Sequence, residues 1–168
     1  MGASKVVRSY MGKIKGLERT VQKTHEWVHA VQRELTGMDE RRAYTALRAV
    51  LHSLRDRLTL DEIAQFGAQL PTFVRGVYYE GWDPTHTPLR KRDAESFLAQ
   101  IRAAFEKTRP AVDPKTVATA VFRVIQSRIS PGEVEDIKGL LPARIRQFWP
   151  QSELRIPKPG RTGAPKAA

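Results

Sequence analysis

The residues best suited to binding a metal are two of the four histidines, His25 and His29. They stand four positions apart, so on a helix their rings share one face and could hold a divalent ion together. No third ligand is signalled nearby, because Glu26 points to another side of the same helical wheel. We therefore expect two solvated surface histidines, and we predict neither a metal site nor a cofactor.

Carboxylates gather in two places, at Asp61-Glu62 and again at Glu133, Glu135 and Asp136. Both groups fall in the first turn of a predicted helix, where the backbone dipole favours negative charge, so capping explains them without acid–base catalysis. The chain has no cysteine, which excludes disulfides, thiolate metal sites and cysteine nucleophiles. It also contains no glycine-rich phosphate loop or dinucleotide fingerprint. We predict that the protein is not an enzyme and has no catalytic residues.

The basic N-terminal segment is the first candidate binding surface. The net charge is +11, of which residues 1–24 carry +5 and residues 151–168 carry +3. Basic side chains neutralise phosphates without needing a fold, and an interleaved tyrosine can stack on a base. These residues are candidates for contacting nucleic acid or a ribosome: Lys5, Arg8, Tyr10, Lys13 and Lys15. The segment also has apolar residues at helical spacing, so it could lie on an anionic membrane or dock on a protein. We favour docking on the protein's own core, and the segment is also a candidate surface for contacting another protein.

An aromatic cluster near the middle of the chain is the second candidate surface. Tyr78 and Trp149 take equivalent positions in the two halves, and we predict that both are core residues. Tyr79 and Trp82 have no counterpart in the second half. Because aromatic rings with a polar tip are favoured at interfaces, these two are candidates for an exposed contact with another protein.

An internal repeat in the sequence predicts the helices that would position these residues. Shifting the chain by 71 residues places Thr45–Tyr78 over Thr116–Trp149 without a gap, and eight of the 34 pairs are identical. The apolar positions recur at three- and four-residue steps in both copies, which indicates amphipathic helices. We predict an all-α fold with two tandem copies of a three-to-four-helix unit. A single unit buries little surface, so we expect one pseudo-symmetric bundle rather than two separate ones.

Capping residues and prolines indicate where the helices begin and end. Thr59-x-x-Glu62 and Ser130-x-x-Glu133 read as capping boxes, and Pro131 stands where a first helical residue tolerates proline. The predicted helices cover residues 22–36, 39–57, 60–69, 71–80, 93–107, 114–128, 131–140 and 142–149.

The predicted organisation has five parts: a basic N-terminal segment (1–21), a first helical repeat (22–82), a linker (83–92), a second repeat (93–150) and a disordered basic tail (151–168). The tail is rich in proline and glycine, a composition that does not form a core. No apolar run is long enough to span a membrane and no secretory signal is evident. We therefore expect a cytoplasmic protein.

Three motifs, LHSLRDRL at 51–58, AQLP at 68–71 and YYEGWDP at 78–84, resemble the uncharacterised bacterial DUF2267 family. The stretch from Leu140 to Trp149 resembles the second half of that family, and the resemblance covers about residues 22–150. It implies a small, helical, two-part bacterial protein with no established catalytic residue or cofactor, and no residue role carries over. We predict a non-enzymatic interaction or adaptor module that binds another protein, with nucleic-acid or ribosome binding as the alternative.

Overall fold

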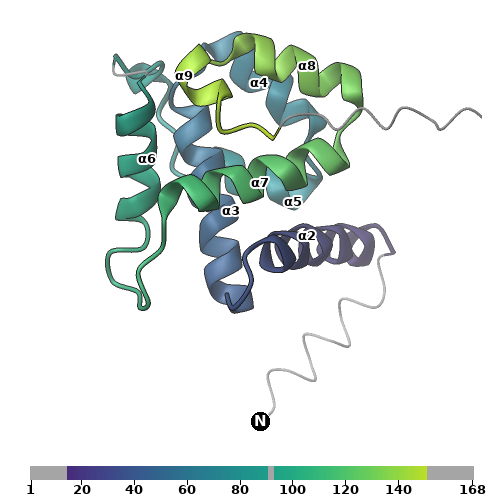
Figure 1. The fold of residues 1–168 in the computed structure, drawn as a ribbon. Helices are drawn as coiled ribbons and strands as arrows, with labels where there is room; N and C mark the ends of the chain where they lie inside the picture. Colours follow the sequence, from purple (N-terminus) through teal and green to yellow (C-terminus); the bar gives the residue numbers. More distant parts are fainter. Residues whose placement is uncertain (1–14, 91–92, 151–168) are drawn as a thin grey trace, which may run out of the picture.

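The computed structural model describes residues 15–90 and 93–150, and within these residues the fold is all-helical with no strand (Figure 1). The helices are α2 (Lys15–Glu34), α3 (Glu40–Arg55), α4 (Leu60–Gln69), α5 (Thr72–Tyr79), the 3-10 helix η1 (Pro84–His86), α6 (Ala94–Ala103), α7 (Pro114–Arg128), α8 (Pro131–Leu140) and α9 (Ala143–Arg146). The predicted all-α class is confirmed. The predicted disordered tail, 151–168, lies outside the described residues. No helix among those described is long and apolar enough to cross a membrane.

Side-chain caps set where the helices begin. Thr59 and Glu62 form the predicted capping box at the start of α4, with the Thr59 backbone N–H donating to Glu62 at 2.7 Å. At α8 only half of the second predicted box is present, since Ser130 accepts from the backbone N–H of Glu133 at 3.4 Å. Three further helices, α3, α6 and α7, follow an aspartate whose carboxylate accepts first-turn N–H groups: Asp39, Asp93 and Asp113.

The first helix differs most from its prediction, because α2 begins at Lys15 rather than at residue 22. Its early turns are exposed, so they show no apolar stripe facing the core. A helix that has been nucleated by its packed part propagates readily into such residues. The hydroxyls of Thr20 and Thr24 also donate to the carbonyls four positions earlier, both at 2.9 Å. By contrast, α6 ends at Ala103 instead of 107, where tighter i→i−3 bonds such as Phe105 N–H to Arg102 take over.

One hydrophobic core runs through the described residues and draws side chains from both halves of the chain. Helix α2 packs on α3, α5 and α7, and α3 also packs on α6 and α7, while α4 contacts α8 (Figure 1). The stripe on α3 is fully buried, with Val50, Leu51 and Leu54 at 0% exposure. Burying a side chain of this size stabilises the fold by about 1.5–3 kcal/mol.

Aromatic rings from both halves of the chain pack within the core. Tyr78 and Trp149 are buried, as predicted. Tyr78 meets Phe66 edge-to-face with ring centroids 5.3 Å apart. Trp149 stacks on Phe122 at 4.5 Å, and Phe122 in turn stacks on Phe97 at 6.1 Å. The end of the chain's second half is therefore held by rings from α6, α7 and the residues after α9.

Candidate functional site

Of the five candidate residues in the basic N-terminal segment, the structure describes one, Lys15. Lys15 is exposed at the first turn of α2. The other four candidates, Lys5, Arg8, Tyr10 and Lys13, lie outside the described residues. Binding of nucleic acid or of another protein by this segment stays a prediction.

The two aromatic candidates, Tyr79 and Trp82, lie against the core and are half-buried. Their ring centroids are 5.6 Å apart, and the Tyr79 hydroxyl donates to the carbonyl of Ile63 at 3.3 Å. This hydroxyl approaches α4 so closely that a Cβ at Gly67 would collide with it. Only part of each ring faces solvent, and their use in a contact with another protein stays a prediction.

The 3-10 helix η1 completes the same corner. Asp83 accepts from the hydroxyl of Thr85 at 2.7 Å and from its backbone N–H at 2.9 Å, and it lies 2.8 Å from Nδ1 of His86. The Thr85 hydroxyl, followed by the other bonds, lowers the pKa of Asp83 to about 2. The indole N–H of Trp82 donates to the hydroxyl of Thr87 at 3.0 Å. The polar groups of this corner are thus bonded to one another.

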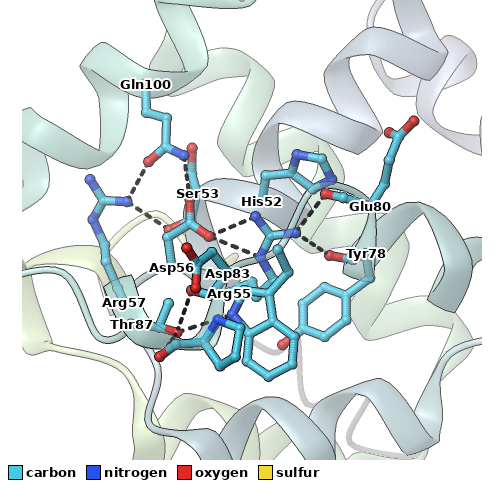
Figure 2. Close-up of polar contacts among 12 residues, drawn as sticks. His52, Ser53, Arg55, Asp56, Arg57, Tyr78, Glu80, Asp83, Thr87 and Gln100 are labelled. Atoms are coloured by element: carbon cyan, nitrogen blue, oxygen red, sulfur yellow. Dashed lines mark hydrogen bonds and ion pairs between the residues drawn. The ribbon is translucent and has the colours of Figure 1, made fainter.

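A buried polar network lies beneath the corner, as Figure 2 shows. The guanidinium of Arg55, 4% exposed, donates to the carbonyls of Tyr78 at 2.7 Å and Glu80 at 3.0 Å. It also pairs with Asp56, with Nη2 and Oδ1 2.8 Å apart. The last carbonyls of a helix have no partner within the helix and carry partial negative charge, so a cation here stabilises the C-terminal end of α5.

Arg57 is the second buried cation of this network, at 1% exposure. Its Nη1 donates to the Ser53 carbonyl at 2.7 Å and to the side-chain oxygen of Gln100 at 2.8 Å. The amide nitrogen of Gln100 donates onward to Asp56 at 2.7 Å, and the guanidinium carbon of Arg57 lies 5.5 Å from the ring centroid of Phe97. Burial lowers the pKa of Arg57, but an arginine remains charged in a protein. The network therefore ties α3 to α6.

His52 joins α3 to α5 and lies on the Arg55 side of the network (Figure 2). Its Nε2 lies 2.6 Å from the carbonyl of Val77, so this nitrogen carries the proton and donates. Burial lowers the pKa of His52, and the positive charges of Arg55 and Arg48 act in the same direction. Because the donors and acceptors of these residues are largely used within the protein, we interpret the network as structural rather than as a binding site.

An open apolar hollow of about 440 Å³ lies between α2, α3 and α5. Its lining consists of Val21, Thr24, His25, Val28, Glu40, Arg41, Tyr44 and Phe73. Tyr44 and Phe73 remain 38% and 41% exposed although both are large and aromatic. Leu17, one helical turn before Val21 on α2, is 43% exposed. Large apolar groups gathered on one face of a surface mark a contact site more often than scattered ones do.

The hollow was not predicted from the sequence, but the repeat contains a signal for it. In the 71-residue register, Tyr44 faces Lys115 and Phe73 faces Arg144. A large aromatic in one copy and a cation in the other cannot both serve an equivalent place in a core. Such unmatched apolar positions distinguish the first half of the chain from the second.

At the rim of the hollow, the structure brings Glu40 to the two histidines. Its Oε1 lies 3.2 Å from Nδ1 of His25 and 3.3 Å from Nε2 of His29. The two imidazole rings have centroids 5.9 Å apart. All three side chains are about half exposed, and their nearest ligand atoms lie within 4.8 Å of one another. Sequence reasoning missed Glu40 because it begins the next helix, fifteen positions after His25.

One protein-family model matches most of this chain. The model described as "Uncharacterized conserved protein (DUF2267)" matches residues 24–148. The chain belongs to this family. DUF2267 membership confirms the resemblance drawn from the sequence, and the matched range contains the whole buried network, the hollow's α3 and α5 residues and the His25–His29–Glu40 cluster. The description of the family carries no activity, and among curated proteins no sequence matches the chain.

Proposed function

We propose that this protein is a non-enzymatic helical module that binds another protein through the hollow between α2, α3 and α5. The supporting observation is the pair Tyr44 and Phe73, two large aromatics that line the hollow and remain partly exposed to solvent. Aromatic side chains are enriched where proteins meet, because they bury a large apolar area at a low entropic cost. A hollow of this size accepts anchoring side chains of a partner helix.

Arg41 at the hollow favours a partner segment that carries a carboxylate. The charged side chains that line the hollow are Glu40 and Arg41, and Glu40 already lies beside His25 and His29. Within residues 15–90 and 93–150, no ion pair within 4.0 Å involves Arg41. The proposed occupant is therefore an amphipathic helix of another protein, with apolar residues at i, i+3 and i+4 in the hollow and a carboxylate that pairs with Arg41.

We also infer that the two halves are copies of one unit, and this bears on the binding role. Helix α3 contacts α7, and α4 contacts α8, so helices that correspond in the repeat lie against each other. This pairing supports a pseudo-symmetric bundle. Since the hollow uses α2, α3 and α5 of the first half, it is a departure from the repeat, which favours a function for it over a packing role.

The rival proposal is that the basic ends bind nucleic acid or a ribosome. Its support is the distribution of the +11 net charge, which is concentrated in residues 1–24 and 151–168. Such binding would depend steeply on salt, since each neutralised phosphate releases counterions. Binding in the hollow would depend on salt only moderately.

Site-specific photo-crosslinking tests the proposal. A photoreactive p-benzoylphenylalanine is placed at position 73 of the full chain, and irradiation is carried out in the cell that makes the protein. The matched control places the same group at position 60, because Leu60 is also an exposed apolar residue (51%) but does not line the hollow. Circular dichroism checks that both variants keep the helical fold.

The proposal predicts that position 73, and not position 60, becomes linked to an amphipathic helix of another protein, identified by sequencing the linked peptide. Adding Tyr44→Glu should remove this adduct, because it places a charge in the apolar hollow, which a partner's apolar side chains would have to cover. An adduct formed equally at both positions would contradict the proposal, and so would an adduct with nucleic acid, with a second copy of this chain or with residues 1–14.

A further inference from the structure

We propose that His25, His29 and Glu40 form a binding site for a divalent transition-metal ion, with Zn²⁺ as the representative cation. This inference does not rest on the proposed protein binding. Two imidazoles and one carboxylate are donors that zinc and its neighbours in the first transition row accept, and three protein ligands leave a further position for water or a partner group.

The distances between the donor atoms suit a shared metal ion. At metal–ligand bonds of about 2.1 Å, two ligands of a tetrahedral ion are about 3.4 Å apart. The Glu40 carboxylate oxygen lies 3.2 Å from His25 Nδ1 and 3.3 Å from His29 Nε2. The third separation, between the two nitrogens, lies within 4.8 Å. A small rotation about the side-chain bonds of the exposed histidines would shorten it.

Two helices position the cluster independently of any metal. On α2, the four-residue spacing puts the two histidines on one face, one turn apart. Glu40 is the first residue of α3, held by the Asp39 cap, whose carboxylate accepts from the Arg42 N–H at 2.8 Å. Helices α2 and α3 also pack against each other through the core. The backbone is therefore fixed, and only side-chain torsions need to adjust when an ion binds.

The alternative is that Glu40 simply pairs with two protonated histidines. A matched feature elsewhere in the chain separates the two explanations. His86 lies 2.8 Å from Asp83, so it is an exposed histidine–carboxylate pair like the others. It has no second histidine beside it, and among the described residues only His25, His29 and Glu40 form a group with metal-binding spacing. A simple ion pair predicts no metal affinity at either place.

Zinc titration of the full chain, produced without a histidine tag and freed of metal by a chelator, tests the site. Isothermal titration calorimetry near pH 7.5 should give one Zn²⁺ per chain. Removing a group that only hydrogen-bonds a metal ligand lowers metal affinity by about 10- to 100-fold. Removing a ligand itself should therefore lower the affinity by at least about tenfold. We expect His29→Ala and Glu40→Gln each to weaken binding by at least about that factor. The control His86→Ala should leave the affinity unchanged.

A second measurement identifies the ligand residues directly. In a ¹H–¹⁵N spectrum of the imidazole nitrogens, zinc should shift the signals of His25 and His29 and leave those of His52 and His86 in place. Binding should also weaken on acidification, because protons compete for the same nitrogens. The inference is overturned if the wild-type chain takes up no zinc, if all four proteins bind it equally, or if the histidine signals that move are not His25 and His29.

Discussion

At the scale of single residues, Arg57 shows how a charge can serve the core. Its guanidinium is buried but bonded to Ser53 and Gln100, and it lies over the ring of Phe97. Removing one member of such a network leaves its partners without bonds in a low-dielectric interior. Arg57 lies in LHSLRDRL, one of the motifs that carry the family resemblance. Its residue type alone, however, predicts a position at the surface.

Arg57→Ala should lower the free energy of unfolding by about 2–4 kcal/mol, because it removes several hydrogen bonds and opens a cavity. Arg123→Ala is the control, since Arg123 pairs with Glu34 at 2.6 Å but is 54% exposed. Its cost should be roughly 0–1 kcal/mol. Urea denaturation followed by circular dichroism measures both. Equal losses would show that the buried network does not stabilise the fold.

His52 gives the protein a pH dependence whose sign follows from its burial. The folded state lowers its pKa below the ordinary 6.5, so the unfolded chain binds the proton more readily. The stability that the neutral ring contributes is present above about pH 6.5 and is lost as the pH falls toward the folded-state pKa.

The variant His52→Gln should therefore lose less stability than the wild type between pH 7 and pH 5. Glutamine keeps an N–H that can donate to the Val77 carbonyl but does not titrate in this range. Urea denaturation at the two pH values checks this difference. A larger pH-dependent loss in His52→Gln than in the wild type would contradict the assignment.

At the scale of helices, the caps distinguish two elements that look alike in sequence. Both α4 and α8 follow a hydroxyl residue and carry a glutamate three positions later. In the structure Glu62 returns the bond to the Thr59 N–H, whereas α8 has only the bond to Ser130. The same sequence pattern therefore contributes different amounts of stability to α4 and α8.

We expect Thr59→Ala to cost about 1 kcal/mol of stability, as for other lost N-caps. Glu62→Ala should cost more than Glu133→Ala, because both remove a first-turn negative charge but only Glu62 also loses a hydrogen bond to the backbone. Chemical denaturation of the three variants measures the order. If Glu133→Ala lowers the stability more than Glu62→Ala does, the hydrogen bond from the Thr59 N–H to Glu62 does not stabilise α4.

At the scale of the whole molecule, the core joins the two halves of the chain. Helix α2 packs on α7, and α3 packs on both α6 and α7, so each half completes the core of the other. A fragment of about 60 residues buries too small a fraction of its surface to be stable alone. The chain should therefore unfold as one cooperative unit.

Two fragments cut at the linker, 1–82 and 93–168, test this expectation. Each alone should show weak helicity and no cooperative melting transition, whereas the full chain should unfold in one step with coincident circular dichroism and tryptophan fluorescence. Independent melting of either fragment would show that the halves are separate folding units.

The sequence by itself determined the helical class, the family and much of the local structure. Helices α4, α7 and α8 were predicted to the residue, because their caps and prolines act on neighbouring positions along the chain. The burial of Tyr78 and Trp149 followed from their equivalent positions in the two halves of the chain. The caps depend on contacts within a few positions, which the order of residues records directly.

Only the tertiary structure decided which distant residues meet. It placed Glu40 beside His25 and His29, opened the hollow around Tyr44 and Phe73, and buried Arg57. These arrangements depend on how α2 and α5 pack on α3, and a side chain's type does not reveal the partner across a helix interface. The histidine pair that the sequence suggested thus gains a third potential ligand because two helices cross at that point.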